Sequence, residues 1–301
     1  MATVIANGIR LNYERTGDGP DVVLVHGLAA NLAFWYLRSV PFLRKEFRVT
    51  AYDLRGHGRS ETAASGYTPA AMADDLHALL DQLGIDQVHL VGHSFGGVVA
   101  LEYALRAPER VRSLTIADSR IQAFQPPQRL RDWPHFEAWK RQLERSGLPV
   151  PDADDVADYH ILARERLAEE RSGRPDEAAS PAFVPFLGGE RRVGKRWLRL
   201  LESTTAKEDF RDPGPPLGLV RQLRPPTLAM FGEMSHCLPS CRGLQGAVGC
   251  RAVIIPRAGH FFPVTRPRAF AASFRAFVLR SDEYEAEKTI EVGGADAGRP
   301  V

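Results

Sequence analysis

Short apolar runs recur along the chain and predict the strands of a sheet. Residues 3–6 and 9–15 alternate apolar and polar positions on either side of Asn7-Gly8, a two-residue signal for a β-hairpin turn. Continuous apolar runs, the pattern of strands buried on both faces, follow at 22–25, 47–52, 88–91, 114–117, 227–231 and 252–255.

Helical patterns lie between these runs. Thr68 is a candidate N-cap for a helix with Pro69 at its first position, which continues through Leu83 and ends at Gly84. Two further helices are predicted at 95–107 and 267–279. Strands that alternate with helices predict an α/β fold, with a mostly parallel eight-stranded sheet that starts in an antiparallel hairpin.

The alternation stops between residues 119 and 224. This segment contains helical patterns at 135–146, 154–171 and 194–203 and no convincing strand, so we interpret it as a helical cap inserted into a core formed by 1–118 and 225–280. Residues 281–301 are polar and Gly-rich, which predicts a flexible tail.

Composition excludes several functional classes. The 301 residues are 44% hydrophobic and 25% charged with a net charge of +2, a balance typical of a globular protein without a nucleic-acid partner. No apolar run approaches the ~20 residues of a membrane span. The N-terminus lacks a signal-peptide pattern, so we expect a cytoplasmic location.

Three cysteines, an odd number, argue against a disulfide framework. Their spacing, with His236 beside Cys237, matches no zinc signature. We therefore expect ordinary thiols and no metal site.

The strongest chemical signal is Gly92-His93-Ser94-Phe95-Gly96, which fits G-x-S-x-G between a predicted strand and a predicted helix. This turn presents the Ser94 hydroxyl at a helix N-terminus, where a developing negative charge is favoured.

Two further segments complete a candidate site. The segment 26–31 follows a strand, and the N–H of Leu28 can pair with the N–H of Phe95 as an oxyanion hole. His260, in a loop after the last strand, is the candidate general base.

Together these motifs resemble the α/β-hydrolase superfamily, in its cap-bearing serine hydrolase branch. The resemblance includes His26-Gly27, the loop 53–60, the turn at 92–96 and Gly259-His260, in family order. It implies Ser–acid–His catalysis without a cofactor, and a structural role for His57.

The acid is missing from its usual place. The family pattern has an Asp at the position of Ser235, and three alternatives follow. Asp118 is the first candidate, because it ends a strand next to the strand of the nucleophile. Some members of the superfamily are similar to this chain in that their acid lies one strand earlier than usual. Glu233 is the second candidate, and a site without any acid is the third.

We expect a serine hydrolase that cleaves a carboxylic ester or thioester through an acyl-enzyme on Ser94. A cofactor-free haloperoxidase or perhydrolase, a C–C bond hydrolase and a non-catalytic binding protein on the same fold remain open alternatives. Large apolar side chains near the motifs and in the cap suggest an apolar or aromatic small-molecule substrate. The candidate pocket residues are Phe34, Trp35, Trp139, Phe183, Phe186 and Phe261.

Overall fold

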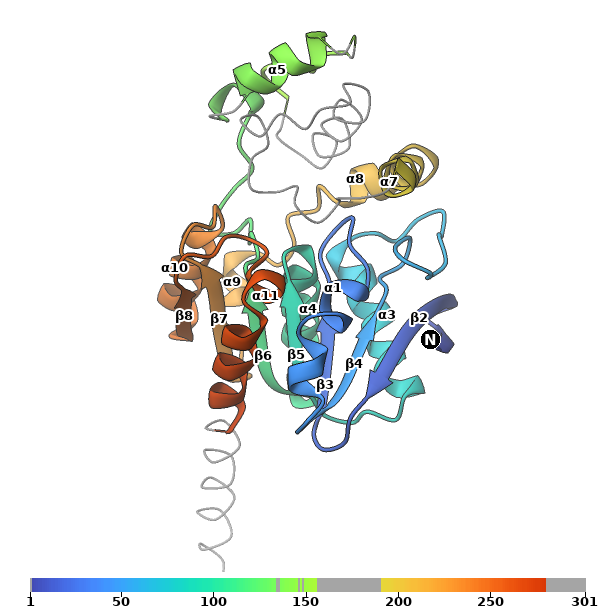
Figure 1. Cartoon of the computed structure of the whole chain (residues 1–301), viewed down its shortest axis with the longest axis vertical. Coiled ribbons are helices and arrows are strands. Elements are labelled where there is room, and N and C mark those ends of the chain that lie inside the picture. Colours follow the sequence, from blue (N-terminus) through green and yellow to red (C-terminus); the bar gives the residue numbers. More distant parts are fainter. Residues whose placement is uncertain (1, 134–135, 146, 148, 156–190, 280–301) are drawn as a thin grey trace, which may run out of the picture.

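An eight-stranded sheet runs through the centre of the protein in the order β1-β2-β4-β3-β5-β6-β7-β8 (Figure 1). The computed structural model describes residues 2–133, 136–145, 147, 149–155 and 191–279. The strands are β1 (Ala2–Ala6), β2 (Ile9–Thr16), β3 (Asp21–Val25), β4 (Arg48–Tyr52), β5 (Val88–His93), β6 (Val111–Ala117), β7 (Thr227–Gly232) and β8 (Arg251–Ile255). Only the β1–β2 and β2–β4 pairs are antiparallel, so the predicted α/β sheet with an initial hairpin is confirmed.

The hairpin turn has the backbone that its sequence requires. Asn7 and Gly8 both have positive φ values, 51° and 70°, the conformation of a turn whose twist matches that of the flanking strands. Ala6 pairs with Ile9 directly across this turn. The turn therefore determines the register of the two strands.

Helices cover both faces of the sheet and divide the core in two. Side chains alternate along β3, so that Val23 and Val25 pack with α3 (Pro69–Gln82) and α4 (Phe95–Arg106). Val22 and Leu24 pack on the opposite face with the helix at 267–279. The shorter helices around this core are α1 (Ala33–Tyr36), α2 (Val40–Leu43), α9 (Leu217–Val220), α10 (Leu238–Val248) and α11 (Phe262–Thr265).

Helix boundaries follow local chemistry. The Thr68 side chain accepts a hydrogen bond from the N–H of Ala71 at 3.2 Å, as an N-cap should, and Pro69 follows at the first helical position. The helix predicted at 95–107 is present and ends at Arg106, and residues 267–279 are helical throughout, as predicted.

The segment between β6 and β7 is a helical insertion, and its described residues contribute no strand to the sheet. It contains α5 (Phe136–Arg145), α7 (Arg191–Ser203) and α8 (Ala206–Asp209), which lie beyond one end of the sheet (Figure 1). Most of the helix predicted at 154–171 lies outside the described residues, as does the predicted tail at 281–301.

The insertion is attached to the core at defined points. Its first turn is held by a hydrogen bond from the buried Ile121 N–H to Oγ of Ser240 on α10, at 2.9 Å. From α7, Trp197 and Leu200 join the main core, whereas α5 packs in a small separate cluster around Trp139.

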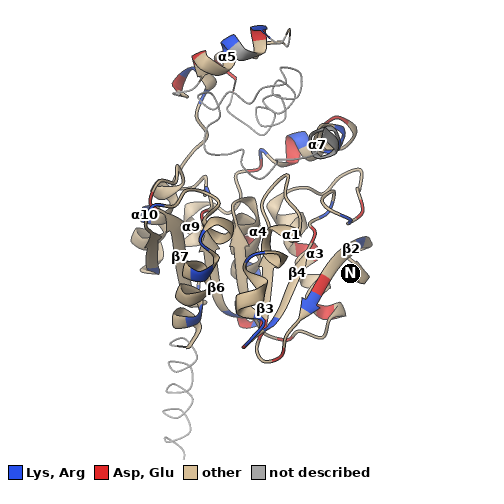
Figure 2. Cartoon of the chain, in the orientation of Figure 1, with Lys and Arg blue, Asp and Glu red and all other residues tan. Residues whose placement is uncertain are grey.

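Charges of both signs are distributed over α5 and α7, so the insertion does not present a uniformly basic face (Figure 2). Within the described part of the chain, none of the helices combines the length and apolar character needed to cross a bilayer.

Candidate active site

The turn between β5 and α4 holds Ser94 in a strained conformation, with φ 55° and ψ −124°. Gly92 and Gly96, two residues to either side of Ser94, must be glycine because the chain passes very close to other backbone atoms there. A Cβ on Gly92 would lie 2.2 Å from the carbonyl oxygen of Gly96, and one on Gly96 would lie 2.4 Å from that of His26. The partly exposed Ser94 therefore stands out from an otherwise buried turn.

Asp118 lies at the carboxyl end of β6, next to the strand that leads to Ser94. Its N–H donates to the carbonyl of Met230 on β7 at 2.9 Å, and its side chain is fully buried. Oδ1 of Asp118 lies 2.9 Å from Nδ1 of His260. The structure thus brings these two sequence-predicted residues into direct contact.

The Asp118 carboxylate accepts two more hydrogen bonds. The N–H of Gly232 donates to Oδ2 at 2.8 Å, and the hydroxyl of Ser235 donates to Oδ1. Burial acts to raise the pKa of Asp118, but the hydrogen bonds and the charge of His260 outweigh it and leave the pKa below its ordinary value. An ionised carboxylate can only accept, so the shared proton lies on Nδ1 of His260 and Nε2 is left to accept a proton.

Glu233, the alternative acid, points elsewhere. It is exposed, and its carboxylate accepts a hydrogen bond from the Arg257 N–H at 2.7 Å. The carboxylate observed against His260 therefore belongs to Asp118.

His93 connects the turn of Ser94 to the loop of His260. Its Nε2–H donates to the carbonyl oxygen of His260 at 2.9 Å, and its ring stacks on Phe34 with centroids 4.5 Å apart. Burial lowers the pKa of His93 to about 3, which keeps the ring neutral. The motif gave no signal for this role, since any residue can occupy that position in G-x-S-x-G.

The segment 26–31 passes directly beside the nucleophile. A Cβ on Gly27 would lie 2.8 Å from Cβ of Ser94, so only glycine permits this approach. The buried His26 holds the loop, because its Nε2 accepts the Leu54 N–H at 3.1 Å and its Nδ1 lies 2.7 Å from the Gly27 carbonyl. Leu28 follows immediately, and Phe95 is the first residue of α4.

The loop at 53–60 has structural contacts. Asp53 accepts hydrogen bonds from the N–H groups of Leu32 and Arg59, each at 2.7 Å. Arg55 forms a buried ion pair with Asp75. His57 is buried, and its Nδ1 lies 2.8 Å from the Arg55 carbonyl. These contacts agree with the structural role inferred for His57.

The predicted pocket residues fall into different environments. Phe34 and Phe261 lie against the site, where the Phe261 ring meets His260 edge to face at 5.0 Å. Trp35 is fully buried against Phe34 and Phe270, and Trp139 is fully buried in the cluster of α5. These two indoles pack in hydrophobic cores, so the structure gives them no open face toward a ligand. Phe183 and Phe186 lie outside the described residues.

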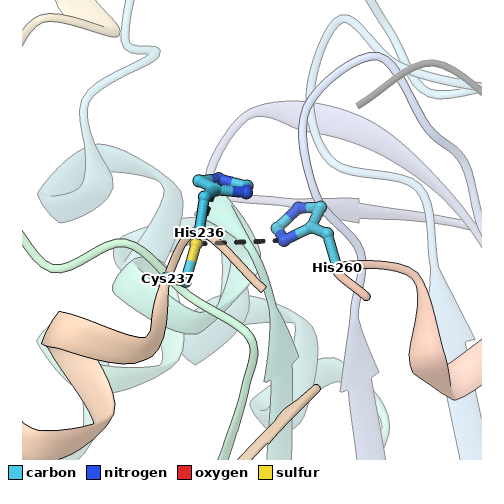
Figure 3. Close-up of side chains that lie close together, drawn as sticks. All are labelled: His236, Cys237 and His260. Atoms are coloured by element: carbon cyan, nitrogen blue, oxygen red, sulfur yellow. Dashed lines mark hydrogen bonds between the residues drawn. The ribbon is translucent and has the colours of Figure 1, made fainter. Parts of the chain in front are cut away.

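Two further side chains reach His260 from the loop between β7 and α10. Sγ of Cys237 lies 3.9 Å from Nδ1 of His260 and 3.2 Å from Nε2 of His236 (Figure 3). Cys237 and Cys241 are buried and Cys250 is half-buried, and all three are free thiols. Spacing along the chain could not indicate this cluster, because His260 enters it from a different loop.

The fold and these motifs agree with comparison to known proteins. Residues 20–267 match the family model of the α/β hydrolase fold. The chain belongs to the α/β-hydrolase fold family, in which the full-length relatives named below are hydrolases, and the resemblance seen in its motifs is confirmed.

Its relatives act in different ways. The chain is 44% identical over 279 residues to “Putative carbamate hydrolase RutD” of Variovorax paradoxus (strain S110), covering 90% of this chain and 96% of that protein. It is 30% identical to 2-hydroxymuconate semialdehyde hydrolase of Pseudomonas sp. (strain CF600), covering 93% and 94%. Among solved structures, a thermophilic esterase from Thermogutta terrifontis has a TM-score of 0.63 and 26% identity, covering 93% and 98%.

Proposed function

We propose that this α/β hydrolase is a serine hydrolase that cleaves a carboxylic ester or thioester. The observation that supports the proposal most directly is the 2.9 Å contact between Asp118 and His260 beside the strained turn of Ser94. A nucleophile, a base and an acid that orients the base are the groups that acyl transfer requires.

The proposed reaction has two halves. Ser94 Oγ attacks the substrate carbonyl while Nε2 of His260 takes its proton, and the N–H groups of Leu28 and Phe95 bind the resulting oxyanion. The leaving alcohol or thiol takes this proton from His260 and departs. Water then attacks the acyl-enzyme by the same route and releases the acid and free Ser94. Throughout, Asp118 holds the Nδ1–H tautomer and stabilises the imidazolium.

The helical insertion, residues 119–224, is the part that we propose selects the substrate as a cap. Phe210, in this segment, packs edge to face on Phe95 at 5.4 Å, and Trp197 stacks on Phe210 at 5.6 Å. The insertion is therefore in contact with the residue next to Ser94. Phe34 and Phe261 add apolar surface near His260, which supports an apolar or aromatic substrate.

A carbamate is the second candidate substrate, because the relative with 44% identity carries that activity in its name. The chemistry would be the same, with a carbamoyl group on Ser94 in place of an acyl group. C–C bond hydrolysis is a further candidate reaction, because the relative with 30% identity is a 2-hydroxymuconate semialdehyde hydrolase. A perhydrolase would differ only in using peroxide instead of water to open the acyl-enzyme.

The test is covalent labelling by a fluorophosphonate, with the modified peptide identified by mass spectrometry. We expect one label on Ser94 and none in a folded Ser94→Ala variant, and turnover of p-nitrophenyl esters should disappear in the same variant. Parallel assays with an aryl carbamate, a dienone and an ester with added peroxide rank the alternatives. An unlabelled wild-type protein without turnover would instead indicate a binding protein.

A further inference from the structure

Three donor atoms that bind soft metal ions converge beside the site. One ring nitrogen of His236, Sγ of Cys237 and one ring nitrogen of His260 all lie within 4.8 Å of one another (Figure 3). His236 is exposed, whereas Cys237 and His260 are buried. The cluster therefore has one ligand at the surface and two behind it.

The spacing fits a tetrahedral ion. With Zn–S near 2.3 Å and Zn–N near 2.0–2.1 Å, sulfur and nitrogen ligands of one zinc lie about 3.6 Å apart. The sulfur–nitrogen distances to Cys237 are 3.2 Å from His236 and 3.9 Å from His260, on either side of that value. The third separation, between the two histidine nitrogens, is at most 4.8 Å.

We propose that His236, Cys237 and His260 capture a thiophilic divalent cation such as Zn²⁺ or Cd²⁺, and that this capture switches off His260 as a base. The site itself rests on geometry, and its effect on catalysis rests on the proposed function. The ion would act as an inhibitor.

The proton balance explains why binding inhibits. The Cys237 thiol gives its proton to solvent and binds as thiolate. The proton on Nδ1 of His260 must move to Nε2 before Nδ1 can bind the ion. His260 then loses its hydrogen bond to Asp118, and Nε2 can no longer accept the proton of Ser94.

The surroundings select the class of cation. One cysteine sulfur and two imidazole nitrogens form a soft donor set, so an ion must bind thiolate and imidazole strongly to occupy it. Zn²⁺ and Cd²⁺ do so, whereas Mg²⁺ and Ca²⁺ prefer oxygen ligands. The ionised Asp118 carboxylate favours a cation here, and Arg120 opposes it with a positive charge.

Binding is measured on the full chain with Co²⁺ as a spectroscopic probe and Zn²⁺ in competition. We expect a thiolate-to-cobalt charge-transfer band that Cys237→Ser abolishes. Loss of an outer-shell partner typically weakens metal binding by about 10–100-fold. Cys237→Ser and His236→Gln each remove a direct ligand, so each should weaken Zn²⁺ binding by at least this factor. The matched control is Cys241→Ser, which removes a nearby buried thiol outside the cluster and should bind Zn²⁺ like wild type.

Inhibition is measured as the rates of ester turnover and fluorophosphonate labelling, each relative to the same variant without metal. Zn²⁺ and Cd²⁺ should slow both rates in wild type and Cys241→Ser, chelator should restore them, and Mg²⁺ should have no effect.

Equal Zn²⁺ inhibition or equal affinity in all variants would overturn the site. Cobalt binding through Cys237 with unchanged labelling would overturn the inhibition alone. A protein that neither turns over nor labels would refute the proposed function, while the cobalt band still decides the site.

Discussion

Ser235 donates a hydrogen bond to Oδ1 of Asp118, the same oxygen that lies against His260. Ser235 occupies the position where the family pattern has its acid, so this position now supports a carboxylate that comes from the neighbouring strand. The N–H of Cys237 donates to Oγ of Ser235 at 3.0 Å, which directs the hydroxyl proton toward Asp118. In the mechanism proposed above, Ser235 is a positioning residue for the acid.

Asp118→Asn should reduce kcat by roughly 10²–10⁴, because an amide stabilises the wrong tautomer of His260 and cannot balance the imidazolium charge. The matched control is Glu233→Gln, since Glu233 contacts Arg257 rather than His260. Steady-state kinetics of the two folded variants, side by side, check the prediction. Near-normal kcat in Asp118→Asn with a strong loss in Glu233→Gln would show that the acid is Glu233.

In the Asp118→Asn background, Ser235→Asp should restore part of the lost kcat. The second substitution returns a carboxylate to the position that the family pattern uses, and Ser235 already lies in the hydrogen-bonded cluster of His260 and Asp118. Ser235→Asn in the same background is the control, because it has a similar size without the charge. Equal kcat for these two double variants would contradict charge-based rescue.

The stability difference between wild type and Asp118→Asn should depend on pH. Because the folded-state pKa of Asp118 is depressed, the stabilisation is fully present above the unfolded value of 3.8 and is lost as pH falls through the lower folded value. Urea unfolding at about pH 5 and about pH 2 should therefore give a larger advantage of wild type at the higher pH. A constant difference would show that the carboxylate is not stabilised in its charged form.

Phe210→Ala should cost about 3–5 kcal/mol of unfolding free energy, as usual for removing a buried aromatic ring. The ring is 2% exposed and meets Phe95, Tyr67 and Trp197 at centroid distances of 5.4, 5.8 and 5.6 Å. Phe210→Leu leaves a smaller cavity and should cost less. Urea titrations of the three proteins check this, and a loss of under about 1 kcal/mol in Phe210→Ala would argue that the insertion is only weakly anchored.

Local signals predicted the sheet and the turn of Ser94 because each depends on short-range backbone rules. Those local signals could not decide whether Asp118 or Glu233 contacts His260, because that contact depends on the order of the strands in the sheet. β6 lies next to both β5 and β7, which places Asp118 between the turn of Ser94 and the loop after β7. The roles of Leu28 and Phe95 as an oxyanion hole stay predictions.

Aromatic side chains were harder to interpret from sequence. Trp35 and Trp139 are apolar residues near motifs or in the insertion, and nothing in their neighbours along the chain distinguishes a core position from a pocket wall. The difference comes from long-range packing, such as that of Trp35 on Phe270. The approach of Cys237 to His260 likewise requires two loops to fold side by side.

Asp118 is the last residue before the insertion, and this sets a rule for building chimaeric enzymes. A transplanted insertion that began at residue 119 would keep the hydrogen bond to Ser240 only if its own backbone placed an N–H where that of Ile121 lies. The first exchangeable residue therefore lies after Ile121. Designers who exchange specificity between enzymes of this kind should keep the three residues that follow Asp118 with the parent core.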